Sequence, residues 1–272
     1  MAFPKSTREV YEKNPLVQVT CGLRFPPILS IISKEPAEFQ ERIRTYYPLY
    51  ETGFVLTPLL QQVVPGAISP QALPSGLPTV HRFISADRTA EIDLARDFIS
   101  VSTKKYRRWE EFRENIELAM SALETVYGPP FYVHVELRYQ DVIDREELGL
   151  GGTPWRELIR EPVIGMLAEP ALADQVISLQ SQTLIDLEEG ALLNLVQSLG
   201  RQVFPQVQIN QQTFSLPAGS PKYGIDADFY TSKRRSSTEV PADLARFNGQ
   251  SGYFFRWAIT SKLRSALRPL LL

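Results

Sequence analysis

The stretch FYVHVELRYQ, from Phe131 to Gln140, decides the fold. Its odd-numbered positions are all apolar or aromatic, and from position 134 onward its even-numbered positions carry hydrogen-bonding side chains. Side chains of a strand point to opposite faces in turn, whereas a helix would scatter both sets. The stretch therefore predicts a strand that buries one face and leaves His134, Glu136 and Arg138 on the other.

The rest of the chain indicates short extended segments and a few helices. We expect helices at 35–47, 109–127, 155–167 and 253–267, where apolar residues recur every three or four positions. Alternation and turn residues predict strands at 15–25, 54–64, 80–85, 90–101, 175–187, 192–209 and 223–231. Strand runs broken by hairpins favour an α+β fold, with antiparallel sheets packed against a few amphipathic helices.

The chain also divides into two parts of similar make-up. A glycine-rich segment at 149–152 predicts an N-terminal half (1–148) and a C-terminal half (149–272) that pack closely together. Segments 17–25 and 132–139 both alternate and both end in Leu-Arg-aromatic. This echo could place the two strands side by side, with Arg24 and Arg138 on one face; coincidence between two short β patterns is the other explanation.

Composition excludes several classes of protein. Cys21 is the only cysteine, so no intramolecular disulfide and no thiolate zinc site can form. The 272 residues carry a net charge of −2, which argues against a surface devoted to nucleic-acid phosphates. No apolar run approaches the roughly 18 residues of a membrane span, and the first residues lack the apolar core of a signal peptide. We therefore expect a cytoplasmic protein without a membrane partner.

The first candidate site is the polar row of the central strand. Arg24, His134, Glu136 and Arg138 form a predicted binding surface, because an arginine fork can hold a carboxylate or a phosphate. The simpler interpretation is a solvated sheet face with cross-strand ion pairs.

Asp226 and Asp228 are the weak metal candidates. They lie on one face of a predicted strand, and paired carboxylates can hold magnesium when a third oxygen ligand and a phosphate are near. The alternative is an edge strand whose charges discourage pairing with another sheet. Because no further acidic cluster accompanies this pair, we expect no metal and no cofactor.

Two basic clusters are candidates for nucleic-acid or phosphate contact. The first is Lys104, Lys105, Arg107 and Arg108, interleaved with aromatic residues, and the second is Lys233, Arg234 and Arg235. Stacking plus phosphate contact suits such a pattern. The simpler interpretation is a solvated segment before the helix, whose cations are balanced by Glu110, Glu111 and Glu114. Near the end of the chain, Phe254, Phe255 and Trp257 form an apolar stripe that could cover a ligand cavity. The simpler interpretation is that these side chains pack in the hydrophobic core.

Four pieces of the chain, at 14–25, 106–112, 137–139 and 255–260, resemble a sporadically distributed prokaryotic family to which no function is assigned. The resemblance spans nearly the whole chain but consists mainly of buried aromatic residues. Gln140 departs from the family pattern, and so do Asn248, where a histidine is common, and Arg256, where an acidic residue is common. The resemblance implies a fold and no catalytic residue, and its patchy distribution is typical of accessory or defence proteins.

The sequence thus favours a non-catalytic binding or adaptor module that recognises a protein partner, through the row around Arg138 or through the loop at 65–78. Phosphate-loop, nucleophile-elbow and zinc-protease motifs are absent. Two alternatives remain: a metal-dependent enzyme or sensor for a phosphorylated small molecule, and a nucleic-acid-binding protein.

Overall fold

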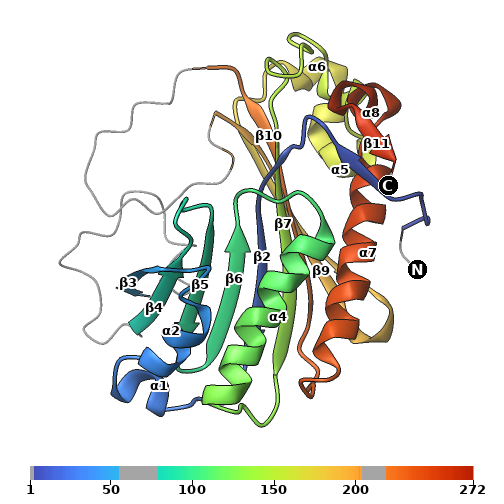
Figure 1. Cartoon of the computed structure of the whole chain (residues 1–272). Helices are drawn as coiled ribbons and strands as arrows, with labels where there is room; N and C mark the ends of the chain where they lie inside the picture. Colours follow the sequence, from blue (N-terminus) through green and yellow to red (C-terminus); the bar gives the residue numbers. More distant parts are fainter. Residues whose placement is uncertain (1–2, 55–78, 202, 204–218, 272) are drawn as a thin grey trace, which may run out of the picture.

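A computed structural model describes residues 3–54, 79–201, 203 and 219–271, and it has the expected α+β fold (Figure 1). The described strands form a nine-stranded antiparallel sheet in the order β3-β4-β5-β6-β2-β7-β10-β9-β8, and β1 pairs with β11 in a separate two-stranded sheet. The strands are β1 (Glu9–Tyr11), β2 (Leu16–Arg24), β3 (Leu49–Phe54), β4 (Thr79–Ile84), β5 (Ala90–Ala95), β6 (Phe98–Thr103), β7 (His134–Ile143), β8 (Leu179–Asp186), β9 (Leu192–Gly200), β10 (Lys222–Thr231) and β11 (Pro269–Leu271).

Strands from both halves of the chain belong to the large sheet. At its centre β7 lies between β2 and β10. Strand β2 runs antiparallel to β7, with Arg24 opposite His134 and Thr20 opposite Arg138. The predicted side-by-side placement, with Arg24 and Arg138 on the same face, is therefore confirmed. The division into two domains at 148/149 stays a prediction.

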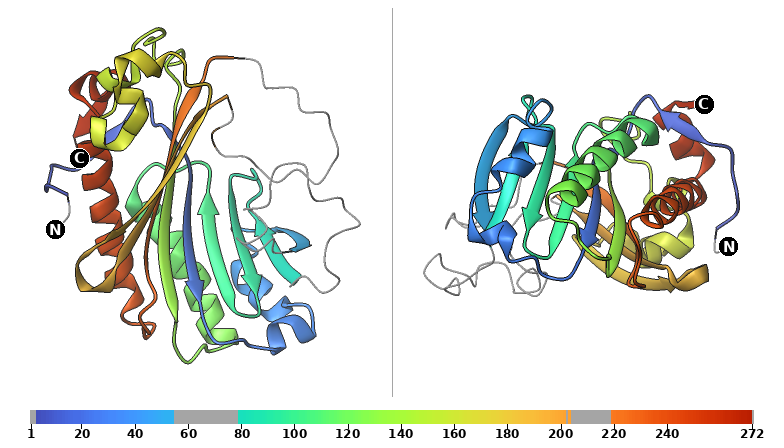
Figure 2. Two further views of the ribbon diagram at one scale, coloured as in Figure 1. Left: turned by 180° about the vertical axis from the view of Figure 1, so that it is seen from behind. Right: turned by 60° about the horizontal axis from the view of Figure 1, so that its bottom comes forward.

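The main helices all lie on one face of the large sheet (Figure 2). The two long ones are α4 (Trp109–Val126) and α7 (Val240–Ala258). The shorter ones are α1 (Ser30–Ser33), α2 (Ala37–Ile43), η2 (Trp155–Glu157), α5 (Glu161–Ile164), η3 (Gly165–Ala168), α6 (Pro170–Ala173), η4 (Glu188–Gly190) and α8 (Ser261–Leu267). We call the sheet surface that faces away from α4 and α7 the open face.

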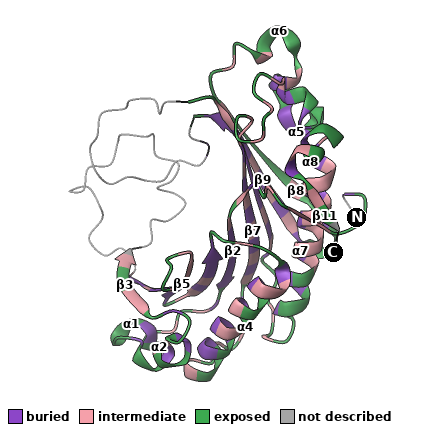
Figure 3. Ribbon diagram, turned by 45° about the horizontal axis from the view of Figure 1, so that its top comes forward, coloured by how far each residue is buried: buried purple, intermediate pink, exposed green. Residues whose placement is uncertain are grey.

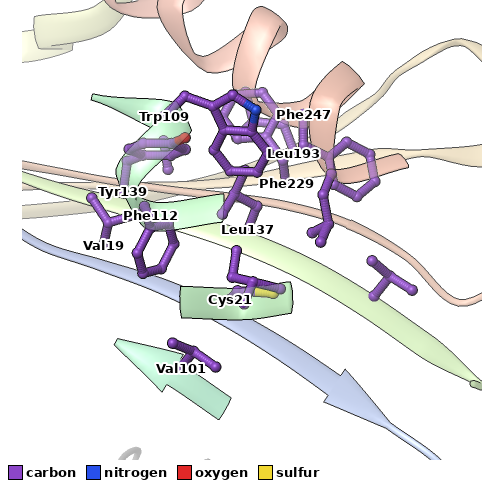
Figure 4. Packing of buried hydrophobic residues seen from close by; sticks show 14 of the residues in the cluster. Val19, Cys21, Val101, Trp109, Phe112, Leu137, Tyr139, Leu193, Phe229 and Phe247 are labelled. Carbon is purple, nitrogen blue, oxygen red and sulfur yellow. The ribbon is translucent and has the colours of Figure 1, made fainter. Parts of the chain in front are cut away.

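The core lies between the sheet and the two long helices. From His134 to Ile143 the burial of β7 alternates strictly, as the sequence predicts. Its inward residues, including Leu137 and Tyr139, meet Trp109 and Phe112 of α4 and Phe247 of α7 (Figure 4). Figure 3 shows the same inner layer as the most buried part of the molecule. Because each fully buried side chain of this size contributes about 1.5–3 kcal/mol, this contact fixes which face of β7 stays open.

The predicted alternation is wrong at the start of the central stretch. Tyr132 is fully buried and Val133 is largely exposed, the reverse of the expected faces. The reason is backbone pairing: Tyr132 exchanges two hydrogen bonds, each 2.8 Å, with Arg235 instead of joining the ladder. Strand β7 begins two residues later, at His134.

Two other segments are divided differently from the prediction. The expected strand 90–101 is a hairpin of β5 and β6, because the polar pair Arg96-Asp97 makes the turn. The expected helix 253–267 is two helices, α7 and α8. Ile259 is extended and pairs with Ile159, and the Thr260 hydroxyl accepts a hydrogen bond from the Leu263 backbone N–H to begin α8.

The remaining differences are smaller. The expected helix 155–167 consists of the short turns η2, α5 and η3, because proline and glycine interrupt it at Pro162 and Gly165. The predicted strand 54–64 and the loop 65–78 lie outside the described residues except for Phe54, and so does most of 201–209. Strand β10 is an inner strand between β7 and β9, so the edge-strand explanation for Asp226 and Asp228 is wrong.

Candidate functional site

The polar residues of β7 and β10 meet on the open face of the sheet. Residues directly opposite in an antiparallel pair share a face, and β10 places Asp228 opposite Arg138 and Asp226 opposite Gln140. His134 and Glu136 continue the row along β7. We call Glu136, Arg138, Asp226 and Asp228, with His134, the carboxylate cluster.

Arg138 and Asp226 form the strongest contact of the cluster. Arg138 Nε donates to Asp226 Oδ1 at 2.7 Å, and its Nη2 makes a second, short hydrogen bond to Oδ2. Gln140 Nε2 donates to Oδ2 at 3.0 Å. Burial by itself would lower the pKa of Arg138, but the hydrogen-bonded Asp226 carboxylate raises that pKa above its usual range. Asp226 is only 5% exposed, so it depends on this guanidinium for its charge balance.

His134 and Glu136 form the second contact. The distance from His134 Nε2 to Glu136 Oε2 is 3.0 Å, and His134 stacks on Tyr230 with ring centroids 5.1 Å apart. Burial opposes ionisation of Glu136, yet the hydrogen bond from His134 and the nearby charges lower the pKa of Glu136. Arg24 contributes to that lowering, so all four residues of the predicted polar row interact electrostatically.

Asp228 is the unsatisfied member of the cluster. Its Oδ1 is buried and has no hydrogen-bond partner among the described residues. Burial, followed by repulsion from Glu136 and Asp226, raises the pKa of Asp228 to about 7, although Arg138 opposes the rise. At neutral pH this carboxyl group therefore exchanges its proton readily, and a cation placed beside it would favour the ionised form.

Gly22 makes room for the Glu136 side chain, which gives a first prediction. A Cβ atom at position 22 would lie 2.3 Å from Glu136 Oε1 and 2.7 Å from its Cγ. We expect Gly22→Ala to displace Glu136, break its contact with His134 and lower the free energy of unfolding by about 1–2 kcal/mol. Thermal unfolding measures this, with Gly53→Ala in β3 as the control, because a Cβ there meets nothing within 4 Å. Equal effects of the two variants would contradict the prediction.

The basic clusters do not form one surface. Lys104, Lys105, Arg107 and Arg108 are exposed and follow β6, whose end pairs with the start of β2. The second cluster lies by the other end of β2 and its charges are largely occupied. Lys233 Nζ donates to the Glu189 carbonyl oxygen at 2.8 Å, Arg235 is ion-paired with Asp243, and Arg234 stacks on Phe131.

The described residues hold no group of three or more histidine, cysteine, aspartate or glutamate side chains arranged to bind a metal ion. Asp226 and Asp228 do share a face, as the sequence predicts, but the oxygens of Asp226 already bind Arg138 and Gln140. The clearest role of Asp226 and Asp228 is thus to add negative charge to the open face.

Comparison with known proteins adds no assignment: neither a model of a protein family nor a curated protein matches the chain. The resemblance to a sporadically distributed prokaryotic family therefore stays a prediction. Among the helices that the structure describes, none combines the length and apolar character needed to cross a membrane.

Sequence reasoning placed His134, Glu136, Arg138 and Arg24 together, but it missed two features. It treated Asp226 and Asp228 as a separate pair, since nothing in a single sequence says that β10 pairs with β7. It also left out Asp141, the next inward position of β7, which is buried. Continuing the alternation one step beyond Gln140 would have found that aspartate facing the core.

Proposed function

We propose that this protein is a non-catalytic binding module that recognises a cationic segment of a protein partner on the open face of its sheet. The charges along the described strands support this function. Following the register from Arg138, the carboxylates of this face are Glu51, Glu91, Asp93, Glu136, Asp186, Asp226 and Asp228, and its cations are Arg24, Arg82, Arg138 and Lys222.

An excess of carboxylates favours one kind of partner. Three of the four cations are already ion-paired, Arg82 with Asp93, Arg138 with Asp226 and Lys222 with Asp144. The net charge of the side chains on the open face is negative. The face therefore attracts lysine and arginine side chains and repels phosphate groups. This weighs against both alternatives on this surface, the phosphorylated small molecule and the nucleic acid.

The observation that carries the proposal is the buried Oδ1 of Asp228, which has no hydrogen-bond partner among the described residues. A buried polar atom without a hydrogen bond costs about 1–3 kcal/mol, and a lysine or arginine of a partner would remove that cost. Glu136 beside it adds a second negative charge. An accessory or defence role, which the family resemblance suggests, is compatible with such a module.

Binding of a short lysine-rich peptide tests this function. We expect wild-type protein to bind it measurably by calorimetry and to ignore a glutamate-rich peptide of equal length. Asp228→Asn removes the charge but keeps the shape, so we expect affinity for the lysine-rich peptide to fall about tenfold, equivalent to about 1.4 kcal/mol. Affinity should also rise as the pH increases through about 7, where Asp228 ionises.

The matched control is Glu114→Gln, which removes an exposed carboxylate from α4 on the helix side of the sheet. It should leave peptide binding unchanged. If Glu114→Gln and Asp228→Asn weaken binding equally, or if both peptides bind alike, the open face is not the recognition surface.

A further inference from the structure

A cavity of about 220 Å³ lies on the helix side of the sheet, away from the carboxylate cluster. Its walls come from the N-terminal segment around β1, the second half of β7, the segment 106–108 just before α4 and the second half of α7. Aromatic rings make up much of the lining, including Tyr11, Tyr106, Tyr139 and Tyr253. Such a concave, largely apolar space with a few polar groups is the usual form of a small-molecule site.

The charged groups in the wall are unevenly compensated. Arg8 is paired with Glu110, Glu9 with Arg264, and Arg108 with Glu111. Arg107 and Arg256 also line the cavity, and among the described residues neither has a carboxylate within ion-pair distance. The uncompensated charge of the lining is therefore positive, which favours an anionic ligand.

Arg256 is held in a fixed position. Its Nε donates to Ser6 Oγ at 2.6 Å, and its two terminal nitrogens lie 3.0 Å from where a Cβ of Gly252 would be. The glycine thus lets the guanidinium rest against the helix. Burial lowers the pKa of Arg256, and the attraction of the nearby Tyr11 and Glu9 side chains offsets that lowering only in part. The two terminal nitrogens have the fork geometry that binds a carboxylate.

Asp141 gives the wall a second polar group. It is 5% exposed, faces the same side of β7 as Tyr139, and lines the cavity. Burial, followed by repulsion from Asp226, raises the pKa of Asp141 to about 8, so it stays largely protonated at neutral pH. A protonated carboxyl group can donate a hydrogen bond to a ligand without repelling an anion.

We infer that this cavity binds a small organic acid, with its carboxylate on Arg256 and its apolar body against the tyrosine rings. The cavity is separate from the open face, and the inference does not depend on the proposed function. The glycines of α7 are part of the site, because a Cβ at Gly249 would meet nothing within 4 Å and the space there remains available to the ligand.

The probes are 3-(4-hydroxyphenyl)propionate and its amide, which have nearly the same shape but differ in charge. We expect millimolar acid to raise the melting temperature of the wild-type protein and to bind at least tenfold more tightly than the amide. Arg256→Gln should weaken binding of the acid at least tenfold and leave binding of the amide unchanged. Gly249→Leu, which fills open space, should weaken both at least tenfold.

Gly249→Ala is the matched control for the filled cavity, since a methyl group leaves most of the space free and suits a helix better than glycine. It should bind the acid like the wild type. The inference is wrong if the acid fails to bind the wild-type protein, if Arg256→Gln binds acid and amide as the wild type does, or if Gly249→Leu binds the acid unchanged. Circular dichroism of each variant confirms that it is folded before binding is measured.

Discussion

We expect the replacement of Arg138 by methionine to lower the free energy of unfolding by about 3 kcal/mol at neutral pH. Methionine keeps the aliphatic part of the side chain but leaves the Asp226 carboxylate, which is 5% exposed, without its guanidinium. Breaking one side of a buried ion pair costs about 3–5 kcal/mol, and we take the lower end because the Arg138 side chain itself is 43% exposed. Unfolding by urea measures the change, with a fall in melting temperature of about 6–12 °C as the second readout.

Two further variants separate this charge effect from lost packing. Arg24→Met removes a guanidinium from the same face that stacks over Phe98 and has no ion-pair partner among the described residues, so we expect a loss below about 1 kcal/mol. The double variant Arg138→Met with Asp226→Asn should recover most of the lost stability, because no isolated charge remains. A double variant less stable than Arg138→Met alone would contradict the assignment.

The second large effect is a gain in stability. We expect Asp141→Asn to raise the free energy of unfolding by a few kcal/mol above about pH 8, since a tenfold change in proton affinity is worth about 1.4 kcal/mol. The wild-type carboxyl group, whose pKa is raised to about 8, must either ionise in the core or hold a proton against the solution. Asparagine has the same shape and never ionises.

The direction of the pH dependence follows from proton binding. An aspartate in the unfolded chain loses its proton near about pH 4, whereas folded Asp141 keeps it up to about 8. Between these values the folded state holds more protons, so the stability of the wild type falls as the pH rises, and it levels off above about 8. Asp228, with a pKa of about 7, adds a smaller decline over a narrower range.

Melting temperatures measured from about pH 4 to about pH 9 test this second prediction. The Asp141→Asn variant should show a flatter profile and cross above the wild type as the pH increases. Asp186→Asn, which changes an exposed carboxylate on β8, should follow the wild-type profile. Parallel profiles for wild type and Asp141→Asn would mean that this carboxyl group is not held protonated.

The sequence predicted the strands that bury one face better than the elements around them. Strict alternation in β7 fixes which side chains face the helices, because the core gains from each buried position and a shift by one residue would reverse them all. The same logic placed β2 correctly and put Arg24 on the face of Arg138. The helix α4 was equally clear, since its apolar stripe matches the surface of the sheet.

Other features depend on contacts between distant residues and could not be predicted. The inward turn of Tyr132 results from pairing with Arg235, more than a hundred positions later. The partnership of Arg138 with Asp226 requires β10 to lie beside β7, which no local pattern states. The break between α7 and α8 depends on the pairing of Ile259 with Ile159. Each of these arises from tertiary structure, and the pairing of β10 with β7 sets the composition of the carboxylate cluster.

The pKa of the Asp228 carboxyl group, followed by carbon NMR with and without a saturating lysine-rich peptide, tests the central claim most directly. The account predicts a value near about 7 in the free protein, because burial and Glu136 oppose ionisation. A bound cation favours the ionised form, so the pKa should fall by at least one unit in the complex. An Asp228 pKa of about 4 in the free protein, or a pKa that does not change when the peptide binds, would contradict the account.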